Sequence, residues 1–273
     1  MTDGLGNRMK RYEAAEAGRR LMPLLPVLAR LDGRAFHSFV RGLDRPFDAR
    51  LSNLMIDTAT FLVRETNATI GYTQSDEITL AWIADGFESQ ILFDGRTQKL
   101  TSVLAALGTA HFHRRLPAFL PPEYADRVPV FDCRVWNVPT LDEAANAFLW
   151  RELDATKNSV AMAARACYAH SAVHGKNRAE MHELLWQKGV NWNDYPPFFK
   201  RGTYIRTRKV TRAFTAAERT ELPERHAARG NPTLLIERTE CGPIELPPLV
   251  SVENRVGVLF RGEVARTKAA AEG

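Results

Sequence analysis

Long hydrophobic runs are missing from this 273-residue chain, in which 45 % of the residues are apolar and 25 % are charged. No apolar stretch approaches the roughly 20 residues that a membrane-spanning helix needs, so the sequence predicts no membrane span. The first residues are charged and hold no apolar segment of the kind found in a secretory signal peptide. We therefore expect a cytoplasmic protein of ordinary globular composition.

Cysteine is scarce as well. Cys133, Cys167 and Cys241 are odd in number and far apart, which predicts neither a disulfide framework nor a zinc knuckle. The excess of basic over acidic residues is also small, with a formal net charge of +5. A basic excess of this size is compatible with a polyanionic partner but does not by itself indicate one.

The chain is organised around an apolar run that ends in an acid. Residues 27–31 lie between Pro26 and Gly33 and are typical of a short buried strand. Asp32 then falls at the C-terminal end of the strand, and Gly33 lets the backbone turn sharply or approach a ligand closely. A second stretch, residues 70–83, has two β-rich runs separated by polar residues, as in a hairpin.

A helix is predicted between these two stretches, and another follows the second. Apolar residues recur at three- and four-residue steps over residues 47–67, with Asp48 as a candidate cap, and again over residues 97–119. Residues 130–138 read as a fourth strand. The order strand, helix, strand, strand, helix, strand predicts a ferredoxin-like α+β fold.

In that fold the third strand lies beside the first and runs antiparallel to it, so Asp32 should meet Asp76. Adjacent carboxylates repel unless a cation joins them, and oxygen ligands completed by water and phosphate are what Mg²⁺ prefers. With the Gly33 carbonyl and a nucleoside triphosphate they would form a two-metal phosphoryl-transfer site, supported by Glu77. The alternative is a simple turn at residues 32–33 and a solvated hairpin tip at residues 76–77.

Two basic segments could hold phosphate. The connection over residues 34–48 starts after a glycine, and its backbone N–H groups and cations, including His37 and Arg45, suit triphosphate oxygens. Arg96 and Lys99 lie three apart at the start of the second helix, on one face near its positive end. The alternative for this pair is a solvated first turn.

Dense, collinear sequence blocks resemble the tRNA(His) guanylyltransferase family. The blocks are Leu31-Asp32-Gly33-Arg34-Ala35-Phe36-His37, Arg45-Pro46-Phe47-Asp48 and Tyr72-Thr73-Gln74-Ser75-Asp76-Glu77, followed by residues 131–135, 150–154 and 200–203. The resemblance covers about residues 7–205. These enzymes extend RNA in the 3′-to-5′ direction on a polymerase-like palm, so the resemblance implies a palm core with a C-terminal extension.

The resemblance also implies site roles, two Mg²⁺ ions, GTP and ATP as substrates, a tRNA partner and a homo-oligomer, with a tetramer compatible. Metal ligands would be Asp32, Gly33 and Asp76, and Glu77 would join the two acids as a catalytic residue. Nucleotide contacts would come from Gly33, Arg34, Ala35, Phe36, His37, Arg45, Ser75, Arg96 and Lys99. Weaker candidates for tRNA or the activating nucleotide are Arg134, Lys157 and Asn158.

The expected organisation is a palm-like catalytic domain over residues 1–138, an extension packed on it over residues 139–262 and a disordered tail over residues 263–273. Residues 141–172 have a helical pattern, with a second helix starting near Asn158. Residues 203–214 read as a half-exposed strand with a basic face, for which an RNA contact and a solvated edge are equally compatible.

One segment predicts the subclass. Eukaryotic members carry His-Ile-Asn-Asn-Leu-Tyr-Asn-Thr where this chain has Thr-Lys-Asn-Ser-Val-Ala-Met-Ala, retaining only Asn158. This departure resembles the bacterial and archaeal Thg1-like proteins. We therefore expect NTP activation of the 5′ end and template-dependent repair of 5′-truncated tRNAs. The alternatives are addition of the extra guanosine of tRNA(His), a palm-type nucleotide cyclase and an RNA-binding protein without catalysis.

Overall fold

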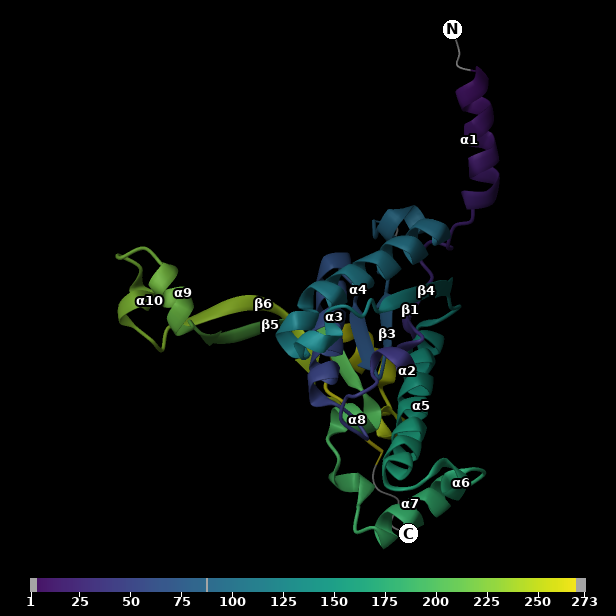
Figure 1. Ribbon diagram of the computed structural model, residues 1–273. Helices are drawn as coiled ribbons and strands as arrows, with labels where there is room; N and C mark the ends of the chain where they lie inside the picture. The colour runs from purple at the N-terminus through teal and green to yellow at the C-terminus, as the bar shows by residue number, and fades with distance from the viewer. Residues whose placement is uncertain (1–3, 87, 269–273) are drawn as a thin grey trace.

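The computed structural model describes residues 4–86 and 88–268. A six-stranded antiparallel sheet with the order β4-β1-β3-β2-β5-β6 runs through the molecule, and most helices pack around it (Figure 1). The strands are β1 (Val27–Arg34), β2 (Ile70–Gln74), β3 (Glu77–Trp82), β4 (Val130–Asn137), β5 (Thr203–Ala213) and β6 (Leu235–Ile244). The helices are α1 (Gly4–Ala17), α2 (Phe36–Phe39), α3 (Ala49–Thr66), α4 (Thr97–Phe119), α5 (Leu141–Cys167), α6 (His170–Val173), α7 (Arg178–Gln187), α8 (Pro197–Arg201), α9 (Ala216–Glu221) and α10 (Ala227–Gly230).

The predicted ferredoxin-like core is confirmed. Its four strands lie in the order β4-β1-β3-β2, and the predicted helices are α3 and α4. Both helices cover the sheet face on which Leu31 and Ile78 are fully buried, whereas α5 covers the opposite face through Phe148. The predicted cap is also present, because Asp48 accepts a hydrogen bond from the Arg50 N–H at 2.9 Å where α3 begins.

The first strand is longer than the sequence indicated. β1 continues through Asp32 and Gly33 to Arg34, since β4 offers backbone partners along this whole length. The chain turns only at Ala35, whose φ is +52°. The sharp turn expected at Gly33 is therefore wrong, and close approach to a ligand stays a prediction. A Cβ at this position would lie 2.3 Å from the Phe36 ring, so the space beside Gly33 is already filled by that side chain.

The expected second helix near Asn158 is likewise corrected. α5 is a single helix of 27 residues, capped by Thr140, and Asn158 lies in its interior. The Asn158 amide donates a hydrogen bond to Asp154 at 3.1 Å, four residues back on the same helix. This bond gives the amide a partner on its own helix, so it does not compete for the backbone as asparagine often does.

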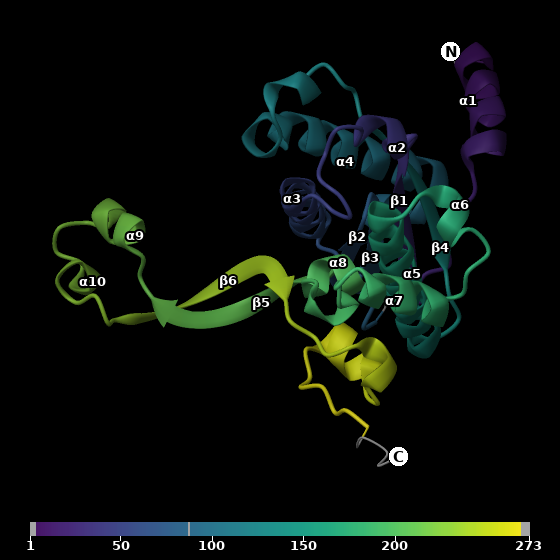
Figure 2. The same ribbon diagram turned by 60° about the horizontal axis from the view of Figure 1, so that its bottom comes forward.

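The extension does not form a separate layer. β5 pairs with β2 through residues 203–205, so it continues the palm sheet across the predicted domain boundary. Beyond that contact β5 and β6 form a long two-stranded arm, which projects from the core and carries α9 and α10 at its tip (Figures 1 and 2). The domain boundaries themselves stay a prediction.

Part of the predicted disordered tail is ordered. Thr267 forms a bridge with Val252, and the Glu253 N–H donates to the Arg266 carbonyl at 2.8 Å. These backbone bonds fix residues up to Lys268, and residues 269–273 lie outside the described part. Within residues 4–86 and 88–268, no helix combines the length and apolar character that crossing a membrane requires.

Candidate active site

Two predicted carboxylates come together where β1 passes the β2–β3 turn. The Gly33 N–H donates a hydrogen bond to the Asp76 carbonyl at 3.1 Å, and Asp32 lies opposite Glu77 in the β1–β3 ladder. Ser75, with a φ of +50°, makes the tight turn, and its hydroxyl donates to the Asp76 carboxylate at 3.0 Å. The topology argument from the sequence thus places Asp32 and Asp76 correctly.

The electrostatics of this pair favour a bound cation. Burial raises the pKa of Asp76 above its ordinary value, and the neighbouring Asp32 carboxylate raises that pKa further. Both effects make the ionised form of Asp76 costly. A positive ion between the carboxylates would offset both.

The donor set fits Mg²⁺. N–H and C=O of one strand residue point to the same side, so the Gly33 carbonyl faces the Asp76 turn, as its N–H does. Two carboxylates and a carbonyl are hard oxygen donors, and Mg²⁺ commonly uses one or two carboxylates together with substrate phosphates. In the described part of the chain no group of three or more His, Cys, Asp or Glu residues could hold a metal. A Mg²⁺ ion held by these groups would need water or substrate phosphate oxygens to complete its coordination.

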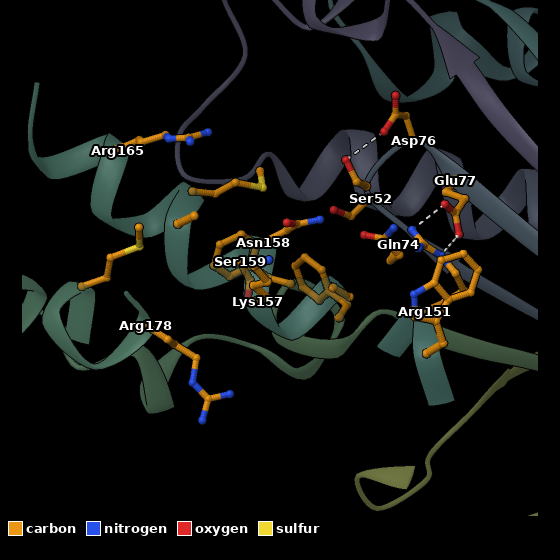
Figure 3. Close-up of a pocket in the computed structure, with 18 of the residues that line it drawn as sticks. Ser52, Gln74, Asp76, Glu77, Arg151, Lys157, Asn158, Ser159, Arg165 and Arg178 are labelled. Atoms are coloured by element: carbon orange, nitrogen blue, oxygen red, sulfur yellow. Dashed lines mark hydrogen bonds and ion pairs between the residues drawn. The ribbon is translucent and has the colours of Figure 1, made fainter. Parts of the chain in front are cut away.

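Glu77 is engaged elsewhere. Arg151 of α5 donates from Nε and Nη2 to its two oxygens, both at 2.7 Å, and Arg30 Nε lies 3.9 Å away (Figure 3). Burial nevertheless raises the pKa of Glu77 above its ordinary value. This geometry gives Glu77 a positioning role between sheet and helix, and its catalytic role stays a prediction.

A third acid was missed by the sequence reasoning. Asp132 lies directly opposite Asp32 in the β1–β4 ladder, and Arg134 Nη2 lies 3.5 Å from Asp132 and 3.8 Å from Asp32. The sequence shows only that Asp132 and Arg134, two residues apart on a strand, share a face; that this face lies beside Asp32 depends on the strand register. Arg134, predicted to contact tRNA or nucleotide, thus lies beside the carboxylates.

A cavity of about 1120 Å³ opens from these acids along α5. Lys157 and Asn158 line it, and their contact with tRNA or the activating nucleotide stays a prediction. Arg165 and Arg178, which the sequence reasoning missed, line it as well. In Figure 3 Arg165 and Arg178 lie at one end, and Glu77 and Arg151 at the other. Arg165 lies seven residues after Asn158, a spacing that places both on one helix face.

The loop expected to hold triphosphate is only partly open to solvent. Arg34, Ala35 and His37 are exposed, and the first N–H groups of α2 have no intrahelical acceptor. The Phe36 side chain instead belongs to the core, with ring centroids 5.7 Å from Phe112 and 5.5 Å from Phe131. The Phe36 side chain is therefore not available to contact a nucleotide.

The remaining predicted nucleotide contacts are spread out. Arg45 is exposed in the loop before Phe47, whose ring lies 4.7 Å from that of the cavity-lining Phe199. Arg96 forms an isolated bridge with Arg20 near the start of β1, and Lys99 lies over Phe93 at 5.0 Å. The carboxylates lie about 16 Å further along β1, at roughly 3.3 Å per residue. Within this chain Arg96 and Lys99 are thus not brought to the acids.

Comparisons with known proteins agree with this architecture. A bacterial tRNA(His) guanylyltransferase (Thg1)-like protein in complex with ATP matches at 37 % identity with a TM-score of 0.69, over 74 % of this chain and 88 % of that one. Another such structure, in complex with GTP, matches at 30 % identity with a TM-score of 0.70, over 91 % and 94 %. The tRNA(His) guanylyltransferase of Schizosaccharomyces pombe is 29 % identical over 213 residues, covering 71 % of this chain and 77 % of its own.

The palm-like sheet and these matches define the class as nucleotidyltransferase. Residues 6–139 also match the family model described as tRNAHis guanylyltransferase. The chain belongs to the tRNA(His) guanylyltransferase (Thg1) family, which confirms the resemblance read from the sequence blocks.

Proposed function

We propose that this protein is a Mg²⁺-dependent enzyme that adds nucleotides in the 3′-to-5′ direction to the 5′ end of tRNA, repairing truncated ends by template. The observation that carries the proposal is the convergence of Asp32 and Asp76 at the mouth of a cavity whose other end is cationic. Relatives solved with ATP and with GTP support nucleoside triphosphates as substrates.

Two group transfers are required. In the first, an oxygen of the RNA 5′-monophosphate attacks the α-phosphorus of an NTP, and pyrophosphate leaves. In the second, the 3′-hydroxyl of an incoming NTP attacks the RNA 5′-phosphorus, the new phosphodiester forms, and the activating nucleoside monophosphate leaves with its electron pair. The hydroxyl proton passes to solvent. When bound, the Mg²⁺ ions would lower the pKa of the attacking hydroxyl and neutralise phosphate charge.

The chain's own residues would hold and orient the reactants. Asp32, Asp76 and the Gly33 carbonyl would hold the ions. The first backbone N–H groups of α2 would contact phosphate oxygens. Lys157, Arg165 and Arg178 line the cavity and would offset the charge of a triphosphate.

Residues 156–163 support template dependence. Lys157, Asn158, Ser159, Ala161 and Met162 line the cavity, so this segment of α5 faces the reactants. It offers no histidine or tyrosine with which to recognise a fixed nucleotide. The attacking 3′-hydroxyl must be held in line with the activated phosphate for the two substrates to react. A base pair between the incoming nucleotide and the opposite RNA strand is then the remaining way to hold it.

The test uses a tRNA transcript that lacks its first nucleotide, with the opposing base changed through all four identities. We expect the incorporated nucleotide to follow the opposing base, and Asp32→Asn to incorporate none. Constant incorporation of guanosine would instead indicate tRNA(His) maturation. A cyclic product from GTP alone would indicate a cyclase.

A further inference from the structure

An exposed tryptophan lies inside the cavity at the carboxylate end. Trp150 lines the cavity from α5, and 54 % of its surface is exposed. Its neighbours Arg151 and Glu152 are both buried. Burial of a large aromatic side chain stabilises proteins strongly, so an indole left open in a catalytic cavity is available for a ligand.

Two arginines hold this indole in place. The guanidinium carbon of Arg151 lies 4.6 Å from the Trp150 ring centroid, and that of Arg30 lies 5.5 Å away, both within cation–π range. Arg151 is itself fixed by its hydrogen bonds to Glu77 and Asp154. The Arg30 Nε is buried and has no hydrogen-bond partner in the described part of the chain. The Arg30 guanidinium interacts instead with the Glu77 carboxylate, 3.9 Å away, and with the Trp150 ring.

The indole is close to the reacting groups. Arg30 and Asp32 share one face of β1, two residues and therefore about 6.6 Å apart. Trp150, next to Arg30, thus lies at the carboxylate end of the cavity. Arg165 and Arg178 lie at the far end (Figure 3). We call the carboxylate end with Trp150 the aromatic flank and the far end with Arg165 and Arg178 the cationic flank.

We propose that Trp150 is the stacking platform for the base of the RNA's 5′-terminal nucleotide. The assignment rests on the proposed function and names the ligand of its aromatic flank. A polyphosphate is better placed on the cationic flank, which leaves the aromatic flank for a base. The RNA end is present in both transfer steps, whereas the nucleotide substrates change.

Stacking also suits an end of variable identity. Every base has a π-face, so an indole accepts any terminal base without reading its edge. Repair requires this tolerance, because the terminal base depends on how many nucleotides are missing. A nucleotide substrate selected by type would instead need hydrogen-bonding groups around its base.

The experiment measures stacking without turnover. A 5′-truncated tRNA with 2-aminopurine as its 5′-terminal base is titrated with enzyme in the absence of NTP, and quenching of the 2-aminopurine fluorescence reports stacking. The wild type and Asp32→Asn should quench. Trp150→Ala should lose the quench and bind the RNA roughly 5- to 150-fold more weakly, the range for one base–aromatic stack.

Matched variants separate the explanations. Trp150→Phe keeps a ring and should restore most of the quench, and Trp186→Ala, a second exposed tryptophan outside this cavity, should behave as the wild type. Undiminished quenching by Trp150→Ala, or an effect on the KM for NTP alone, would overturn the assignment. So would a loss of thermal stability with the quench intact. An active Asp32→Asn would instead refute the proposed function and leave the stacking result standing.

Discussion

The backbone N–H of Gly33 bonds to the carbonyl oxygen of Asp76 at 3.1 Å, although the two residues are 43 positions apart. This bond joins β1 to the β2–β3 turn directly beside both carboxylates. The spacing of the acids is therefore set by backbone geometry, and a side chain at residue 33 should disturb it.

We expect Gly33→Ala to lower both stability and activity. Its Cβ would lie 2.3 Å from the buried Phe36 ring, and overpacking of this kind costs about 1–3 kcal/mol. The matched control is Gly242→Ala, where no atom lies within 4 Å of the new Cβ. The free energy of unfolding in urea and the rate of nucleotide addition are the measurements. Equal values for the two variants would show that the contact between residue 33 and the Phe36 ring affects neither.

Asp32→Asn and Asp76→Asn should each reduce nucleotide addition by more than about 100-fold, because a lost ligand should cost more than a lost outer partner of a metal site. Circular dichroism should show an intact fold. Asp126→Asn, an exposed acid away from the site, is the control. Near-normal turnover by either site variant with Mg²⁺ present would disprove the metal assignment.

Mg²⁺ should raise the melting temperature more at neutral pH than at acidic pH. The folded-state pKa of Asp76 lies above its ordinary value, so the folded protein binds this proton more tightly than the unfolded chain. Stability from this group is thus present at low pH and is lost as pH rises through the raised pKa. Mg²⁺ offsets that loss only where the carboxylate is ionised. Thermal melts across pH test this, and the effect should vanish in Asp76→Asn.

Arg151→Ala should destabilise the fold. It leaves the Glu77 carboxylate buried without its two 2.7 Å hydrogen bonds, a loss that typically costs about 3–5 kcal/mol. We expect a loss at the lower end of this range, because Arg30 remains 3.9 Å from Glu77 and still offsets part of its charge. Adding Glu77→Gln should recover part of the loss. A cost below about 1 kcal/mol for the single variant would contradict a tight ion pair.

Arg178→Ala should weaken NTP use more than Lys99→Ala. Arg178 lines the cavity, whereas Lys99 lies in the first turn of α4, just after Arg96, which forms a bridge with Arg20 ahead of β1. A charge-assisted phosphate contact contributes about 1.5–3 kcal/mol. The KM for NTP at saturating tRNA is the measurement. The reverse order would contradict a triphosphate contact by Arg178.

The sequence predicted the core well because its signals were local. Period-3.6 spacing gave α3 and α4, and the element order gave the contact between Asp32 and Asp76. It failed where partners from distant segments decide. Gly33 stays in a strand because β4 pairs with it, and the ion pair of Glu77 with Arg151 was not foreseen because Arg151 lies 74 residues further on. Asp132 was missed because strand register is visible only in the folded sheet.

The β5–β6 arm has a consequence for how this chain could vary in length. Only residues 203–205 of β5 pair with the core, while the following residues to Ala213 pair with β6 alone. Strand faces repeat every two residues, so removing two residues from each strand shortens the arm by about 6.6 Å without reversing its faces. The reach of α9 and α10 is thus adjustable in discrete steps that leave the palm untouched. Removal of one residue from each strand would instead turn every more distal side chain to the other side.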